Sequence, residues 1–94
     1  MKVYIVTRDF ESDYYGESYS EYNVFVGAYG SMDHARAAIM EMTTEEKLGG
    51  QIYERTVNDV VEISASVRYP EVVSITYDSR GTATATYDIV VCEI

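Results

Sequence analysis

Apolar and polar residues alternate along most of this chain, and the pattern predicts strands at both ends of the sequence. Residues 2–8 place apolar side chains on both faces of an extended segment, which predicts a strand inside a sheet rather than at its edge. Residues 22–29 form a second apolar segment, and two such neighbours pair most simply as an antiparallel hairpin. The polar stretch between them is predicted to be a loop that projects from the end of the sheet.

The spacing changes to that of a helix after Gly30. Ser31 is a typical N-cap residue and predicts a helix start. The apolar residues then recur every three or four positions, a stripe typical of a helix that packs on a sheet: Met32, Ala35, Ile39 and Met42. Thr43 and Glu46 match a capping box and predict one further short turn, and Gly49-Gly50 ends the helical region.

Period-two alternation returns at residue 51. It predicts strands over residues 51–57, 61–69, 73–77 and 82–92, with turns at Asn58-Asp59 and residues 78–81. The last strand places five residues on its core side: Ala83, Ala85, Tyr87, Ile89 and Val91. We therefore predict one α+β domain over residues 1–94. It has an antiparallel β-sheet of five to six strands with one main α-helix packed on one face, in the order ββα followed by a β-meander.

The outer face of the later strands changes character along its length. It is rich in Ser and Thr over most of the strands, but near the C-terminus it carries Val90, Cys92 and Ile94. A single helix covers only one face of a sheet, so this apolar end is exposed, lies under a loop or meets another molecule. These three residues are our candidate for self-association, as a homodimer.

The stretch from residue 9 to residue 22, DFESDYYGESYSEY, combines carboxylates with tyrosines and contains no basic residue. Carboxylates pair with Lys and Arg of a partner, and tyrosine rings provide buried contact area at a low entropic cost. The predicted partner-binding residues are Asp9, Glu11, Asp13, Tyr14, Tyr15, Glu17, Tyr19 and Glu21. The alternative is a solvated connection whose tyrosines pack back onto the sheet.

The chain has 16 acidic and 7 basic residues, for a net charge of −9. This excess disfavours nucleic acid and anionic membranes as direct partners, because each phosphate contact needs a cation. The acidic excess instead favours a basic protein as the partner. Carboxylates spaced along an extended segment also imitate the phosphates of a nucleic acid. The single cysteine forms no intrachain disulfide and no segment resembles a signal peptide, so we expect a cytoplasmic location in a bacterial host.

The sequence gives little support for a catalytic or cofactor-binding site. His34 is the one histidine, in the first turn of the predicted helix, and no nucleophile elbow or phosphate-binding loop occurs. Asp9-x-Glu11-x-Asp13 resembles the start of an EF-hand loop, but the required Gly and Glu at positions six and twelve are Tyr14 and Ser20. We therefore predict no enzymatic activity, no metal and no cofactor.

The order KVYIVTRDFESDY followed by VFVGAYGSMDHARAAI resembles small acidic accessory proteins encoded by bacteriophages. Size, acidity and the lack of catalytic motifs also resemble the anti-CRISPR proteins, many of which occlude the nucleic-acid channel of a Cas effector. This resemblance implies an inhibitor that blocks a nucleic-acid-binding surface of a host protein by acidic mimicry. Two alternatives stay open: a homo-oligomeric structural phage protein, and a sponge for nucleotide second messengers.

Overall fold

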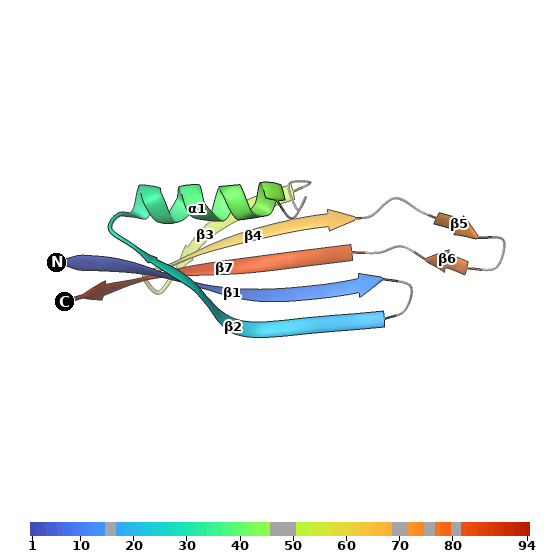
Figure 1. The fold of residues 1–94 in the computed structure, drawn as a ribbon, viewed down its shortest axis with the longest axis horizontal. Coiled ribbons are helices and arrows are strands. Elements are labelled where there is room, and N and C mark those ends of the chain that lie inside the picture. The colour runs from blue at the N-terminus through green and yellow to red at the C-terminus, as the bar shows by residue number, and fades with distance from the viewer. Residues whose placement is uncertain (15–16, 46–50, 69–71, 75–76, 80–81) are drawn as a thin grey trace.

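The computed structural model describes residues 1–14, 17–45, 51–68, 72–74, 77–79 and 82–94. Five strands form one antiparallel sheet in the spatial order β2-β1-β7-β4-β3 (Figure 1). Their bounds are β1 Lys2–Tyr14, β2 Glu17–Tyr29, β3 Gln51–Val57, β4 Val60–Arg68 and β7 Thr82–Glu93. The predicted α+β class, the ββα order and the interior position of the first strand are confirmed.

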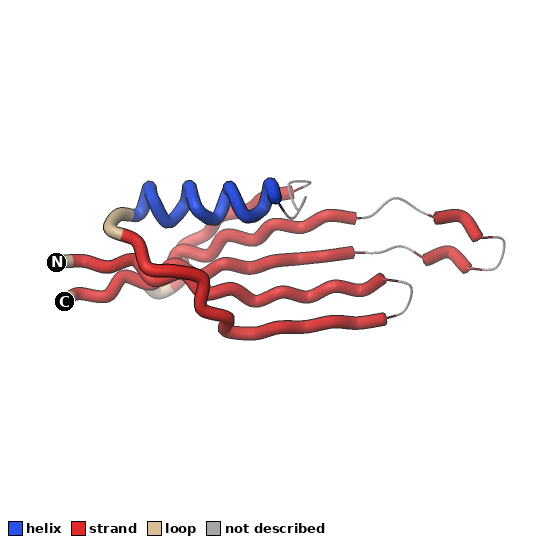
Figure 2. The backbone as a smooth tube through the Cα atoms, viewed as in Figure 1, coloured by secondary structure: helices blue, strands red, loops and turns tan. Residues whose placement is uncertain are grey.

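The helix α1, Met32–Glu45, covers one face of this sheet (Figure 2). The backbone amide of His34 donates a hydrogen bond of 3.1 Å to Oγ of Ser31, so Ser31 is the N-cap as predicted. Ala35 and Ile39 are fully buried against the sheet, and Met32 and Met42 pack beside them. The predicted apolar stripe is therefore the face that the helix buries.

The core lies between α1 and the central strands. Its sheet side consists of Val6 from β1, Val61, Ile63 and Ala65 from β4, and Ala83, Ala85, Tyr87 and Ile89 from β7. Val91 continues the same face but is 40% exposed, because it lies at the end of β7. Four of the five predicted core positions of the last strand are thus buried.

The helix is much shorter than the strands it covers. Fourteen helical residues span about 21 Å, at 1.5 Å per residue. The 13 residues of β1 span about 44 Å, at 3.4 Å per residue. The far half of the β1–β2 hairpin therefore extends past the core, and Tyr19 on its helix side is 53% exposed.

The prediction that the acidic stretch between the first two strands is a loop is wrong. β1 continues to Tyr14 and β2 begins at Glu17, so nearly all of the acidic stretch is paired β-strand. β1 also pairs with β7 along nearly its entire length, from Lys2–Glu93 to Asp13–Thr82. Backbone hydrogen bonds to strands on both sides hold these polar residues in extended form although their side chains favour turns.

Two register shifts interrupt the β1–β2 pairing, one between Val6 and Thr7 and one between Arg8 and Phe10. Asn23 lies at the second shift with φ of 54°. Side chains along residues 22–29 therefore do not alternate strictly between the two faces of the sheet, since each bulge reverses which residues face the core. Val26 packs on the core, whereas Phe25 and Tyr22 are largely exposed.

Other predicted boundaries also change. Residues 73–77 are not one strand: β5, Val72–Ser74, pairs with β6, Tyr77–Ser79, in a separate two-stranded ribbon. Thr43 lies inside α1 and donates a hydrogen bond to the Met40 carbonyl, so it does not start a new turn. The predicted positions Glu46, Gly49 and Gly50 lie outside the described residues. Asn58 and Asp59 do form the β3–β4 turn, with φ of 51° and 64°.

Candidate functional site

The sheet has a second face that α1 does not cover, which we call the open face. Residues that alternate with the buried positions of β1, β4 and β7 point to this face. Toward the hairpin tip it is polar, with exposed carboxylates on β1 and with Ser and Thr on the neighbouring strands. Because side chains alternate along a strand, the acidic stretch is divided between the two faces of the sheet.

Three of the predicted site residues share the open face, and we call them the acidic row: Asp9, Glu11 and Asp13. Successive members are two residues apart on β1, which separates them by about 6.8 Å. Tyr22 Oη donates a hydrogen bond of 2.7 Å to Glu11 Oε1, and the Asn23 amide donates one of 2.8 Å to Asp9 Oδ1. Strand pairing and these contacts fix two of the three carboxylates before any partner binds.

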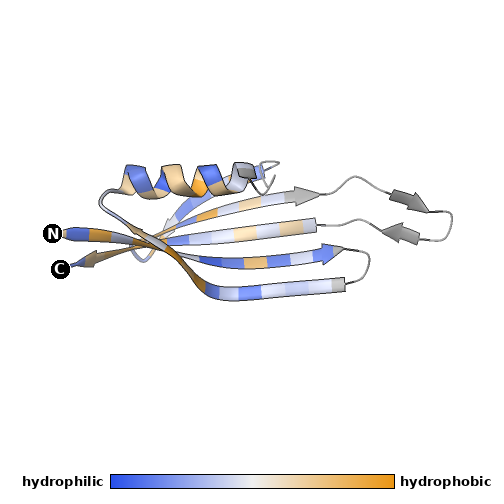
Figure 3. Cartoon of the chain, in the orientation of Figure 1, coloured by the Kyte–Doolittle hydropathy of each residue, from blue (hydrophilic) through white to orange (hydrophobic). Residues whose placement is uncertain are grey.

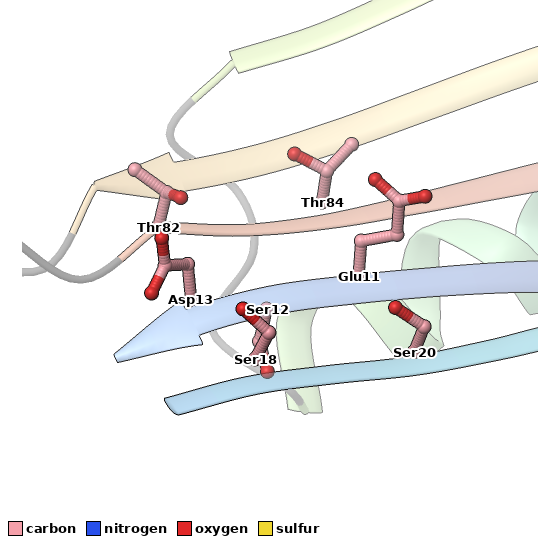
Figure 4. A pocket seen from close by; sticks show the side chains of 7 residues that line it. All are labelled: Glu11, Ser12, Asp13, Ser18, Ser20, Thr82 and Thr84. Atoms are coloured by element: carbon pink, nitrogen blue, oxygen red, sulfur yellow. The ribbon is translucent and has the colours of Figure 1, made fainter. Parts of the chain in front are cut away.

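A shallow depression of about 280 Å³ lies at the hairpin end of the sheet (Figure 4). Its lining residues come from three adjacent strands: Glu11, Ser12, Asp13, Ser18, Ser20, Thr82 and Thr84. The two carboxylates and the hydroxyls of Ser18, Ser20, Thr82 and Thr84 supply hydrogen-bond acceptors on the open face. The depression therefore suits a cationic group such as a lysine or arginine side chain, and its lining has no basic residue to hold a phosphate.

The remaining predicted site residues lie elsewhere. Tyr19 and Glu21 lie on the helix side, where Tyr19 Oη donates a hydrogen bond to Glu21 Oε1. This bond, helped by partial burial and the Glu21 charge, raises the pKa of Tyr19, and the nearby Arg8 partly offsets the shift. The backbones of Tyr14 and Glu17 pair at the tip of the hairpin, and Tyr15 lies outside the described residues.

The helix side of the hairpin also carries an aromatic cluster around Arg8. The Arg8 guanidinium lies 4.7 Å from the centre of the Phe10 ring and 5.8 Å from that of Tyr87. Phe10 in turn contacts Tyr19, with ring centres 6.2 Å apart. Tyr19 therefore contacts this cluster through Phe10 while it stays 53% exposed.

The open face also contains a pair of acidic residues that the sequence reasoning missed, Asp88 and Glu62. Asp88 on β7 lies directly opposite Glu62 on β4, and Asp9 of β1 is close by. Burial raises the pKa of Asp88, and the negative charges of Glu62 and Asp9 raise it further. Its Oδ1 is buried and accepts no hydrogen bond within the described part of the chain. Glu62 is itself paired with Arg55, at 2.9 Å.

At the opposite end, near the termini, the open face is apolar. Val90 is 39% exposed and Ile94 is 81% exposed, whereas Cys92 is half-buried. Figure 3 shows the change of character along the strands: hydrophobic segments gather near the two termini, and paler or hydrophilic segments extend toward the hairpin tip. Because Val90 and Ile94 are exposed, they do not lie under a loop. They either face solvent or contact another molecule.

Within the described ranges, no three His, Cys, Asp or Glu side chains are grouped to hold a metal ion. Over those same residues, no helix is long and apolar enough to cross a membrane. No protein-family model matches the chain, and neither a curated protein nor a solved structure shows significant similarity to it.

Proposed function

We propose that this protein is a non-enzymatic inhibitor that binds a basic, nucleic-acid-handling protein through the acidic row. The target is a groove that normally holds nucleic acid, as in a Cas effector, and the mechanism is direct competition. The observation that carries the proposal is the alignment of Asp9, Glu11 and Asp13 on one uncovered sheet face.

The spacing of the acidic row supports mimicry of a nucleic-acid strand. Negative groups about 6.8 Å apart in a straight line present a charge pattern similar to that of successive phosphates along an extended strand. Because β1 is hydrogen-bonded to β2 and β7, the row keeps this geometry without a partner. A preformed array loses less conformational entropy on binding than a loop would.

The surroundings of the row fit the same role. The depression beside Glu11 and Asp13 can receive a lysine or arginine side chain, whose charge the two carboxylates would balance. The Ser and Thr hydroxyls around it accept further hydrogen bonds from the same group. A nucleotide sponge is less favoured, because phosphates would meet these carboxylates.

A displacement assay tests the proposal. Labelled DNA or RNA is bound to each member of a panel of purified Cas effectors, and its fluorescence anisotropy is followed as the protein is added. We expect displacement from at least one effector, weakening as salt rises from about 50 to 300 mM. The double variant Glu11→Gln, Asp13→Asn should compete about 30-fold less well, at about 1 kcal/mol for each lost ion pair.

The matched control is Glu41→Gln, Glu93→Gln. It removes the same two charges from exposed positions away from the acidic row, on α1 and at the end of β7. Equal loss of competition in both double variants would mean that net charge alone acts, and the acidic row would not be the site. Absence of displacement across the panel would refute Cas effectors as the target.

A further inference from the structure

The strand β2 forms one edge of the five-stranded sheet, beside β1 (Figure 1). Toward the hairpin tip it pairs with β1 without a register shift, from Phe10–Glu21 to Asp13–Ser18. Its other side pairs with no strand among the described residues. Alternate backbone N–H and C=O groups along that side therefore point to solvent, where they can pair with another extended chain.

The two edges of the sheet differ in charge. Natural proteins often protect a free edge with lysine or proline, and β2 contains neither; its only charged residues are acidic. The opposite edge, β3, carries Arg55 and Glu54, which form ion pairs of 2.9 Å with Glu62 and 2.8 Å with Arg36. A basic segment would therefore meet a cation at the β3 edge but none at the β2 edge.

Two small residues on β2 leave the acidic row accessible from outside the sheet. Ser18 and Ser20 are exposed on the open face, beside Asp13 and Glu11 of β1 (Figure 4). A strand added to β2 would lie about 4.8 Å from it and about 9.6 Å from β1. The long, flexible side chain of a lysine can cross a serine and reach the carboxylate behind it. The depression is thus open to cations from the β2 edge.

We propose that β2 binds an extended basic segment of the partner protein as an added strand of the sheet. Backbone hydrogen bonds hold the segment, and two lysine or arginine side chains, two positions apart, pair with Glu11 and Asp13 in the depression. The carboxylates are about 6.8 Å apart, which is also the spacing of alternate residues in the added strand. This mode of binding rests on the proposed function, which supplies a basic partner, and adds the conformation that its segment takes.

Charge and hydrogen bonding together select a basic peptide as the occupant of this edge. A second copy of the chain would bring two acidic edges together, each from a protein of net charge −9, and like charges repel. A nucleic-acid strand would meet the same repulsion through its phosphates. A basic peptide neutralises the carboxylates and also satisfies the free backbone groups of β2.

Fluorescence anisotropy with synthetic peptides tests strand addition without the natural partner. The first labelled peptide, of about eight residues, alternates lysine with threonine. The second has the same composition, but pairs of lysines follow pairs of threonines, so neither face of the extended peptide has lysines at neighbouring positions. We expect the first to bind about fivefold more tightly, because only it can place cations beside both Glu11 and Asp13, and both to weaken with salt.

Backbone methylation separates strand addition from simple charge attraction. In a strand, the N–H groups of successive residues point to opposite edges. The alternating peptide is therefore made with N-methyl groups on its lysines, or instead on its threonines, at the same net charge. Only one of these two sets faces β2, so one methylated peptide should bind at least about 10-fold less well than the other. The peptide that fails also shows in which direction the added strand runs.

Lysine substitutions at the two edges form a matched pair. Ser20 and Gln51 are the two ends of one cross-strand line, whose other members are Glu11, Thr84 and Ser66. Ser20→Lys and Gln51→Lys each add one positive charge to an exposed edge position of the open face. We expect Ser20→Lys to weaken binding of the alternating peptide about 10-fold, since its side chain covers Glu11, and Gln51→Lys to change it less than about twofold. If Ser20→Lys does not fold, Ser18→Lys carries the same expectation.

Four results would overturn strand addition at β2. They are no binding of the alternating peptide up to about 1 mM, equal binding of the two lysine patterns, equal binding of the two methylated peptides, and equal losses in Ser20→Lys and Gln51→Lys. Displacement of nucleic acid without peptide binding would leave the acidic row as the site and remove the added strand. Peptide binding without displacement would keep the added strand and refute the Cas effectors as targets.

Discussion

Replacing Asp88 with Asn should stabilise the protein at neutral pH. Asp88 lies opposite Glu62, and at about 6 Å two charges in water repel by about 0.7 kcal/mol, which the Arg55–Glu62 pair and salt reduce. The buried Oδ1 without a hydrogen bond adds a desolvation penalty of roughly 1 kcal/mol. Allowing for solvent screening, we expect a gain of about 1 kcal/mol, or about 5 °C in Tm.

The stabilisation expected from Asp88→Asn depends on pH, and the pKa shift of Asp88 sets the sign of that dependence. The pKa of Asp88 is raised above its ordinary value of 3.8 in the folded protein, so the folded state binds a proton more tightly than the unfolded chain. The destabilisation is therefore absent at low pH, where Asp88 is protonated in both states, and grows as pH rises through the folded pKa. The advantage of Asp88→Asn should be fully present at pH 7 and should shrink toward pH 3.

Urea unfolding at pH 7 and at pH 3 measures both effects. The control is Asp13→Asn, which removes one negative charge from an exposed position on the same face. We expect Asp13→Asn to change the unfolding free energy by less than about 0.5 kcal/mol at either pH. Our account of Asp88 would be refuted if Asp88→Asn destabilised the protein at pH 7, or if its effect were the same at both pH values.

Three further substitutions test the fold. Ile39→Ala should lower the free energy of unfolding by about 3 kcal/mol in urea titrations, because Ile39 is fully buried under the helix; a loss below 1 kcal/mol would contradict this core. Asp59→Gly should raise the thermal midpoint by a few degrees, since Asn58 and Asp59 both have positive φ and Asn-Gly is the preferred pair in such a turn. A double-mutant cycle on Arg36 and Glu54, 2.8 Å apart and each more than 40% exposed, should give a coupling below about 1 kcal/mol that falls with salt.

Local periodicity was sufficient to predict the elements that make the core. The Met32-to-Met42 stripe identified the helix, and the alternation over residues 82–92 identified the last strand and its buried side. The position of β7 between β1 and β4 could not be predicted in this way, because the β1–β7 pairing joins residues 69 to 91 positions apart along the chain. The same distant pairing keeps residues 9–13 extended, where local preference indicated a loop.

The error about the loop also affected the candidate site. In a loop, eight acidic and aromatic residues could turn to one partner, whereas in a strand alternation sends Asp9, Glu11 and Asp13 to one face and Tyr19 and Glu21 to the other. Asp88 was missed because a single carboxylate in a hydrophobic strand gives no local signal. Its surroundings come from Glu62 and Asp9 on two other strands.

The pairing of β1 with β7 joins Lys2 to Glu93, at opposite ends of the sequence. During synthesis, the first strand must therefore wait for the last one to leave the ribosome before the centre of the sheet can close. Until then the β1–β2 hairpin, the helix, the β3–β4 hairpin and the β5–β6 ribbon can form, each from local contacts. Because closing so long a loop is entropically slow, we expect the newly made chain to spend time with the β7 side of β1 unpaired, a state in which chaperones would bind it.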